Sequence, residues 1–216
     1  MKLLVTGGCG FIGSNFIRHI LKKYPDYEII NLDALTYSGN LENQRDIKKD
    51  KRYRFAHGRI DDVDLVMDVL GRVDYVVNFA AETHVDRSIH DAQPFIITNI
   101  LGTHILLEGA RTSSIKKFIH ISTDEVYGTL EEKGKFTEET LLSPNSPYAA
   151  SKASGDMLAH AYHKTYGLPV VIVRPSNNYG YYQFPEKFIP LMITNLLLDK
   201  QVPVYGKGEN IRDWLF

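Results

Sequence analysis

The sequence predicts an α/β protein built on a doubly wound parallel sheet of the Rossmann type. Two observations favour this fold. Strand-like apolar runs alternate with helical patterns along most of the chain, and several runs are continuously apolar rather than alternating with polar residues. Continuous apolar runs are expected where helices cover both faces of a sheet. Because ligands of such sheets bind at the carboxyl ends of the strands, the residues that follow each strand are the first candidates for function.

The expected elements follow one another as strand, helix, strand. The strand-like runs lie at 2–6 (KLLVT), 28–32 (EIINL), 53–57 (YRFAH), 75–79 (YVVNF), 118–122 (FIHIS) and 170–174 (VVIVR). Apolar residues recur at helical spacing over 12–23, 62–71, 93–113, 146–166 and 186–199. Pro147 stands at the start of the fourth helix, where a missing backbone N–H is tolerated.

Composition limits the classes of function. The 216 residues are 44% hydrophobic and 24% charged, as in an ordinary globular protein, and the net charge is −1. That balance gives no electrostatic reason to expect nucleic acid or a membrane as a partner. The single cysteine, Cys9, cannot form an internal disulfide, which favours the cytoplasm. No stretch is long and apolar enough to cross a bilayer, and the amino-terminal apolar run is shorter than that of a signal peptide.

A glycine-rich loop follows the first strand. Residues 6–15 read TGGCGFIGSN and contain the pattern Gly7-x-x-Gly10-x-x-Gly13 at the start of a helix. Such glycines let backbone amides approach a pyrophosphate, whose charge is met by the helix N-terminus. Asp33 ends the next strand, 20 residues after Gly13, and is placed to accept hydrogen bonds from ribose hydroxyls and to repel a 2′-phosphate. The loop therefore predicts NAD rather than NADP; the alternative is a glycine-rich turn beside an ordinary surface aspartate.

A tyrosine and a lysine share one face of the fourth helix. Residues 146–156 read SPYAASKASGD, so Tyr148 and Lys152 are four residues apart. An ammonium near a phenol is expected to lower the phenol's pKa, and such a tyrosine can take a proton from a sugar hydroxyl while a hydride leaves the carbon. Without the glycine loop upstream, the same pattern would indicate only an exposed amphipathic helix.

Two adjacent acids stand where the fifth strand opens onto solvent. The stretch 122–128 reads STDEVYG and places Thr123, Asp124 and Glu125 just after the strand. Neighbouring carboxylates can act as acid and base if their environments separate their pKa values, and burial or its neighbour's charge is expected to raise that of Asp124. The alternative is that both acids only cap a loop.

Several longer motifs carry a resemblance to a known family. They are TYSGNL (36–41), FAAETHVDRSI (79–89), STDEVYG (122–128), YAASK (148–152), NNYG (177–180), FPEKFIP (184–190) and RDWL (212–215). Together with the glycine loop they resemble the extended short-chain dehydrogenase/reductase family, and within it the dTDP-glucose 4,6-dehydratases. The resemblance implies a lyase that dehydrates dTDP-glucose to dTDP-4-keto-6-deoxyglucose with NAD. The steps would be oxidation at carbon 4, elimination of water across carbons 5 and 6, and hydride return to carbon 6.

The resemblance also implies roles for single residues. Tyr148 would be the base for oxidation, Glu125 the base at carbon 5 and Asp124 the acid for the departing hydroxyl, with Thr123 and Lys152 completing the catalytic set. The cofactor-binding residues would be Gly7, Gly10, Phe11, Ile12, Gly13, Asp33, Ile60, Ala80, Ala81, Thr98, Tyr148, Lys152 and Asn178. The substrate-binding residues would be Thr83, Thr123, Asn177, Lys187 and Arg212. No metal is implied.

The chain departs from the family pattern in two places. Arg59 stands where the family usually has an aspartate near the adenine, and the following carboxylates, Asp61 and Asp62, are the candidates to replace it. The sequence also stops at Phe216, whereas family members usually continue. Residues 1–180 are expected to form an NAD-binding Rossmann-type domain with the catalytic residues, and 181–216 to begin an incomplete nucleotide-sugar-binding part. A fragment of this kind is expected to bind NAD but turn over poorly.

Assembly and two rival functions complete the expectations. Related dehydrogenases pair through two helices, which predicts a homodimer through 93–113 and 146–166. These helices carry apolar residues on more than one face, among them Ile97, Ile100, Leu101, Ile105 and Leu106. The first rival is a UDP-sugar 4-epimerase or decarboxylase of the same family, which would need the tyrosine and NAD but, for epimerisation, no acid–base pair for elimination. The second is an NAD-binding protein without turnover.

Overall fold

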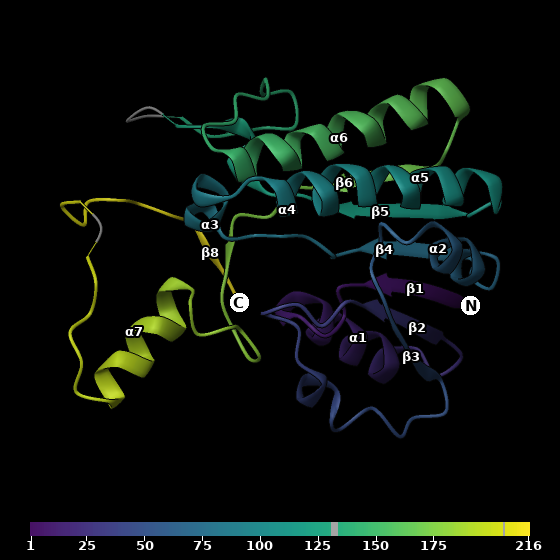
Figure 1. The fold of residues 1–216 in the computed structure, drawn as a ribbon, viewed down its shortest axis with the longest axis horizontal. Coiled ribbons are helices and arrows are strands. Elements are labelled where there is room, and N and C mark those ends of the chain that lie inside the picture. The colour runs from purple at the N-terminus through teal and green to yellow at the C-terminus, as the bar shows by residue number, and fades with distance from the viewer. Residues whose placement is uncertain (131–133, 205) are drawn as a thin grey trace.

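A six-stranded parallel sheet forms the centre of the molecule and confirms the predicted fold. The computed structural model describes residues 1–130, 134–204 and 206–216. The strands lie in the order β3-β2-β1-β4-β5-β6, and every neighbouring pair is parallel. They are β1 (Lys2–Thr6), β2 (Glu28–Asp33), β3 (Tyr53–His57), β4 (Tyr75–Asn78), β5 (Lys117–Ile121) and β6 (Val170–Val173). The carboxyl ends of the strands point toward the side of the molecule where the last helix lies (Figure 1).

Helices cover the two faces of the sheet unequally. One face packs on α2 (Val63–Leu70), α5 (Thr103–Thr112) and α6 (Pro147–Tyr166) around a large buried cluster that includes Phe118. The other face packs on α1 (Phe11–Lys23) through a smaller cluster. Burial of these apolar side chains is the main driving force for the fold.

The predicted helix over 93–113 is divided into three segments. The chain forms α4 (Gln93–Phe95), then a π-helix, η2 (Ile96–Gly102), and then α5. Within η2 the Asn99 amide donates to the Glu82 carbonyl at 3.0 Å and accepts from the Glu82 N–H at 2.9 Å. It also donates to Ser151 on α6 at 2.9 Å. π-turns occur often at functional sites, and here Asn99 ties the loop after β4 to α6.

Three short helices were not anticipated from the sequence. They are η1 (Leu41–Gln44), α3 (Val85–His90) and η3 (Asp124–Tyr127). Each begins at a residue whose side chain accepts a backbone N–H of the first turn. Segments of four to six residues are too short to show a helical period, so their caps were the only signal.

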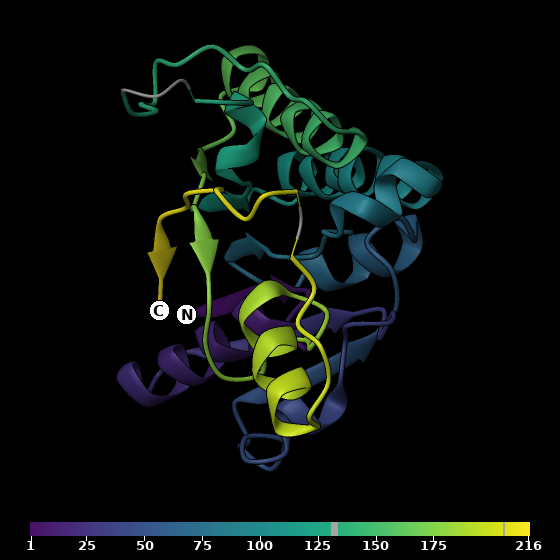
Figure 2. The ribbon, with the colours of Figure 1, turned by 90° about the vertical axis from the view of Figure 1, so that its left-hand side faces the viewer.

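The segment from Asn177 to the end extends away from the main sheet. β7 (Asn177–Asn178) pairs in parallel with β8 (Trp214–Leu215). This small sheet joins the two sides of the boundary expected at residue 180. Between its strands lies α7 (Phe188–Leu197), which stands beside the sheet edge (Figure 2) and has no buried residue.

The apolar residues on the helices expected to pair in a dimer differ in exposure, as residues on different helix faces should. Leu106 is fully buried in the core of its own chain, and Ile105 packs against that core. Leu101 remains 46% exposed. In the described residues no helix combines the length and apolar character needed to cross a membrane.

Candidate active site

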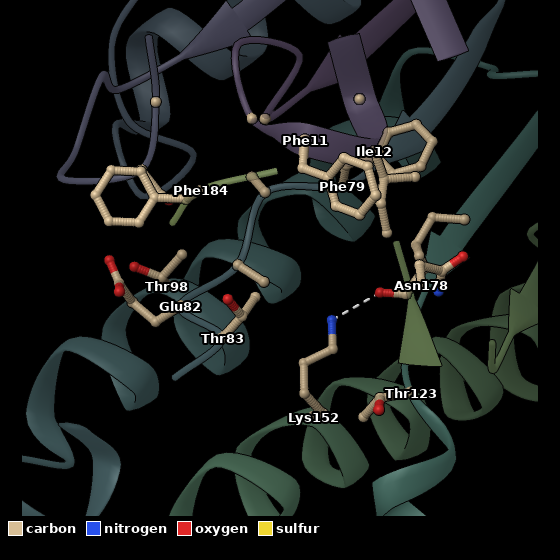
Figure 3. A pocket seen from close by; sticks show the side chains of 18 of the residues that line it. Phe11, Ile12, Phe79, Glu82, Thr83, Thr98, Thr123, Lys152, Asn178 and Phe184 are labelled. Atoms are coloured by element: carbon tan, nitrogen blue, oxygen red, sulfur yellow. Dashed lines mark hydrogen bonds between the residues drawn. The ribbon is translucent and has the colours of Figure 1, made fainter. Parts of the chain in front are cut away.

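One pocket of about 350 Å³ lies at the carboxyl edge of the sheet. Side chains from opposite ends of the sequence converge on it (Figure 3). The predicted residues that line it are Gly7, Gly10, Phe11, Ile12, Gly13, Asp33, Ile60, Ala80, Ala81, Thr83, Thr98, Thr123, Asp124, Glu125, Tyr148, Lys152, Asn177, Asn178 and Lys187. Of the predicted residues, only Arg212 lies outside the lining.

The glycine loop is held so closely that side chains cannot enter it. Gly7 has a φ of +66°, and a Cβ there would lie 2.7 Å from the Ala80 nitrogen. A Cβ on Gly13 would overlap the Gly7 carbonyl oxygen. Gly10 begins α1, whose first turn contains no acidic residue. Free N–H groups at a helix start without neighbouring acids favour an anion such as phosphate.

We expect Gly13→Ala to destabilise the protein by about 1–3 kcal/mol, since the added methyl group must displace backbone rather than a flexible side chain. In a chain of this size that loss lowers the melting temperature by several degrees. Gly71→Ala is the matched control: a Cβ there would meet its nearest atom, the Met67 carbonyl oxygen, at 3.6 Å. Thermal unfolding that gave equal midpoints for the two variants would contradict the expectation.

Asp33 braces the glycine loop as well as facing the pocket. Its carboxylate accepts the Cys9 N–H and the Leu35 N–H, each at 2.8 Å. Burial raises the pKa of Asp33, and these two hydrogen bonds oppose the rise. The carboxylate is therefore fixed at the end of β2 by the loop that it supports.

Arg59 lines the pocket beside one of its two expected substitutes. Its guanidinium pairs with Asp61 at 2.8 Å, and both residues belong to the pocket wall. The Asp62 side chain instead caps α2 by accepting the Leu65 N–H at 3.1 Å. Asp61 is thus the carboxylate that remains near the place expected for adenine.

Tyr148 and Lys152 are both buried, and their electrostatics differ from the prediction. The Lys152 ammonium donates to the Ile121 carbonyl at 2.7 Å (Figure 3). Burial lowers the pKa of Lys152 to about 8, while Asp156 opposes that shift. Burial also raises the pKa of the Tyr148 phenol, and nearby Glu125 adds to the rise. The expected lowering of the Tyr148 pKa by Lys152 is wrong for this structure, because desolvation outweighs the favourable contacts.

The two acids lie on η3, which positions both of them toward the pocket. The Thr123 hydroxyl caps this turn by accepting the Glu125 N–H at 3.3 Å, and it lies 3.3 Å from Asp124 Oδ1, to which it donates. Burial raises the pKa of Asp124, as predicted. Burial also raises the pKa of Glu125, and the charge of Asp124 raises it further. Both carboxyls are therefore protonated more readily in this site than they would be in water.

Residues predicted to bind substrate, and Asn178 of the predicted cofactor set, lie around these acids. Lys187 donates to the Thr83 carbonyl at 2.9 Å, and burial lowers the pKa of its ammonium. Asn178 donates to the Ser176 carbonyl at 2.7 Å, which fixes its amide at the pocket wall. Arg212 is exposed and donates to its neighbour's carbonyl. Its charge partly opposes the rise in the pKa of both acids, so it stands close enough to act on the site.

The structure adds two glutamates to the pocket. Glu82 follows β4, so its position after a strand was a signal for it in the sequence, and burial raises its pKa. Glu186 accepts from the Tyr37 hydroxyl at 3.0 Å and pairs with Arg87 at 3.5 Å. Glu186 does not directly follow any of the predicted strands, so the rule that ligands bind after strands did not point to it. In the described residues no three His, Cys, Asp or Glu side chains are grouped to hold a metal ion.

Comparisons with known proteins agree with the site. A family model described as GDP-mannose 4,6 dehydratase matches residues 4–216. A dTDP-glucose 4,6-dehydratase of Streptomyces niveus is 53% identical over 219 residues, which cover 100% of this chain and 65% of that protein. The chain thus spans about two thirds of the length of this curated relative.

Two solved structures share the architecture. DesIV, a dTDP-glucose 4,6-dehydratase from Streptomyces venezuelae crystallised with NAD and TYD bound, matches with a TM-score of 0.97 and 53% identity, over 100% of this chain and 68% of that one. A UDP-glucuronic acid 4-epimerase from Bacillus cereus in complex with UDP-glucuronic acid and NAD matches with a TM-score of 0.93 and 36% identity. That match covers 99% of this chain and 68% of the epimerase.

Proposed function

The chain belongs to the GDP-mannose 4,6 dehydratase family, and from that premise we propose that the protein dehydrates dTDP-glucose to dTDP-4-keto-6-deoxyglucose with NAD as cofactor. The observation that carries this proposal is that Asp124 and Glu125 line the same pocket as Tyr148 and the glycine loop. An elimination needs a base and an acid beside the group that performs the oxidation, and this pocket supplies both.

The residues present fit NAD. The glycine loop leaves a cradle that a Cβ on Gly7 or Gly13 would fill, and α1 offers it an N-terminus free of acids. Asp33 stands where a ribose would lie, 20 residues after the last glycine. When bound, NAD supplies a hydride acceptor and a positive charge near Tyr148. We propose residues 1–180 as the unit that holds it and 181–216 as the start of the nucleotide-sugar-binding part.

Each catalytic side chain has a specific task in the proposal. In its phenolate form, Tyr148 takes the proton of the 4-hydroxyl, and Thr123, which also contacts the Tyr148 oxygen, aligns that hydroxyl. Lys152 brings a positive charge into a dry site, where it stabilises the phenolate. Glu125 removes the proton at carbon 5 and Asp124 protonates the departing hydroxyl, a role that suits a carboxyl whose pKa is raised by burial.

The diphosphate of the substrate is assigned to the cations on the other wall. Lys187 lines the pocket. Arg212 lies outside the lining, but the charges of both cations oppose the rise in the pKa of Glu125. Thr83 and Asn177 provide hydroxyl and amide groups for the sugar. The dTDP-glucose dehydratases among the relatives support thymidine as the nucleoside.

A UDP-sugar 4-epimerase is the second candidate, because a structural neighbour at 36% identity has that activity. Epimerisation requires Tyr148 and NAD but no acid–base pair for elimination, so Asp124 and Glu125 favour the dehydratase. A protein that binds NAD without turnover would need neither the Asp124–Glu125 pair nor the Tyr148–Lys152 pair.

Mass analysis of the product separates these functions. The full-length protein incubated with dTDP-glucose is expected to yield a product lighter by one water, and UDP-glucose is expected to react much more slowly. A product of unchanged mass with inverted configuration at carbon 4 would establish the epimerase instead, and no product from either sugar would support binding without turnover.

We predict that NAD⁺ binds at least about tenfold more tightly than NADP⁺, because a 2′-phosphate would approach the Asp33 carboxylate in a partly buried site. Dissociation constants for both cofactors, measured by isothermal titration on one preparation, test the prediction. Equal affinities would refute it.

We propose a homodimer that pairs through the η2–α5 and α6 helices. Leu101 and Met157, on these helices, are 46% and 58% exposed. Light scattering at micromolar concentration is expected to give twice the monomer mass, and Leu101→Glu with Met157→Glu to give the monomer. Met67→Glu, an exposed apolar position on α2, is the control and should leave the mass doubled. A monomeric parent would refute the proposal.

A cytoplasmic location is also proposed, since Cys9 is the single cysteine.

A further inference from the structure

A buried polar chain runs beneath the proposed active site and centres on Asp156. This aspartate is 1% exposed and lies on α6, four residues after Lys152 and therefore on the same helix face. One of its carboxylate oxygens accepts from Arg174 Nε at 2.7 Å. The other faces the Nε2 atom of His120 at 3.6 Å, an electrostatic contact that is too long for a hydrogen bond. A buried carboxylate with two such partners calls for an explanation, because burying charge is costly.

The arm through His120 reaches β5, the strand whose last residue accepts the Lys152 ammonium. Thr6 donates to Asn78 Oδ1 at 2.6 Å, so the Asn78 amide is oriented to donate to His120 Nδ1 at 3.3 Å. That contact assigns the imidazole proton to Nε2, the atom that faces Asp156. His120 is neutral, since burial and the charges of Lys152 and Arg174 hold its pKa well below the usual value. The next residue, Ile121, provides the carbonyl that accepts the Lys152 ammonium.

The arm through Arg174 reaches the turn that bears the two acids. Arg174 follows β6 and also donates to the Tyr127 hydroxyl at 2.9 Å. Tyr127 is the last residue of η3, the short helix that contains Asp124 and Glu125. The Tyr127 ring is buried and lies under the guanidinium at 5.2 Å. Asp156 is thus linked through one side chain to the acids and through its own helix to Lys152.

We propose that Asp156 is a positioning residue for the reaction: its buried carboxylate fixes the Lys152 ammonium on one side and the acid-bearing turn on the other. The assignment rests on the proposed function. The charges that act on Lys152 support it: burial favours the neutral amine, and Asp156 is the carboxylate that opposes this change. Neutral His120 on β5 and Tyr148 on α6 add no negative charge near the ammonium. The acids on η3 act on Tyr148 instead.

The charge of Asp156 can be removed without changing its shape. In Asp156→Asn, the pKa of Lys152 should fall from about 8 by about one unit, so the protonated fraction at pH 8 falls from about half to about a tenth. NMR of lysine side chains labelled with carbon-13, with the Lys152 signal assigned from Lys152→Arg, measures this in the full-length protein. The alkaline limit of NADH formation should move down in pH by the same amount, and Asp156→Glu should restore part of it.

The matched control is Asp68→Asn, which removes the exposed ion pair between Asp68 of α2 and Arg72 and should move neither the titration nor the pH limit. An unchanged Lys152 titration in folded Asp156→Asn would overturn the proposal. This titration needs no sugar nucleotide, so it decides the electrostatic part of the proposal even if the proposed substrate is wrong.

Tyr127→Phe tests the arm through Arg174. It leaves the ring in the core, so it can be used even if Asp156→Asn does not fold. It removes only the hydroxyl that Arg174 contacts, so the acid-bearing turn loses its anchor while the Lys152 titration and NADH formation stay within about twofold of the parent. Loss of water should slow by about tenfold, since small displacements of catalytic groups cost rates of this order or more. Loss of water at the parent rate would overturn the proposed link between Asp156 and the acids.

Discussion

Replacing Tyr148 with phenylalanine is expected to abolish the formation of NADH when the protein is mixed with dTDP-glucose, with a loss on the order of 10²–10⁴-fold in rate. The variant lacks the phenol oxygen that accepts the proton of the 4-hydroxyl, so the hydride cannot leave carbon 4. The ring should stay in place, because it packs against the Phe95 ring in a T-shaped contact, with 6.3 Å between the ring centres. Absorbance of reduced nicotinamide in single-turnover mixing measures the effect.

A second tyrosine on the same helix provides the control. The Tyr162 hydroxyl bonds to Glu108 at 2.9 Å and does not line the pocket. Tyr162→Phe therefore makes the same chemical change on α6 and should leave NADH formation within about twofold of the parent. NADH formation by Tyr148→Phe at the parent rate would remove the phenol from the mechanism.

The behaviour of Tyr148 also shows where sequence reasoning stopped. The spacing to Lys152 correctly placed both side chains on one helix face and in one pocket, because helical geometry is local. The direction of the phenol's pKa shift could not be predicted in the same way. It depends on how deeply α6 is buried against β5 and on which acceptor the ammonium finds, here the Ile121 carbonyl. Both are properties of the tertiary packing.

The same limit applies to the rest of the fold and site. Continuous apolar runs and the rule that ligands bind after strands predicted the sheet and most of the pocket, because parallel strands bring their carboxyl ends to one edge. The π-helix and Glu186 were missed. The first is an irregularity within an otherwise helical pattern. The second lines the pocket and bonds to Tyr37 and Arg87, which are distant in sequence.

Replacing Glu125 with glutamine is expected to separate the two halves of the reaction. Glutamine keeps the size of the side chain but cannot take the proton at carbon 5, so oxidation should proceed and elimination should stall with NADH bound. A positioned base contributes on the order of 10²–10⁴-fold in rate, so the stalled species should persist long enough to be seen in single-turnover mixing. Glu138→Gln, at an exposed acid, is the control and should complete the reaction.

The pH dependence of the parent protein checks the same assignment. A base must be ionised to act, and burial together with Asp124 raises the pKa of Glu125. As the solution is acidified, elimination should therefore stop at a higher pH than it would with a glutamate of ordinary pKa. Below that pH NADH should accumulate, as expected for Glu125→Gln. The assignment is wrong if Glu125→Gln abolishes NADH formation as completely as Tyr148→Phe does. It is equally wrong if the variant removes water from the substrate at the parent rate.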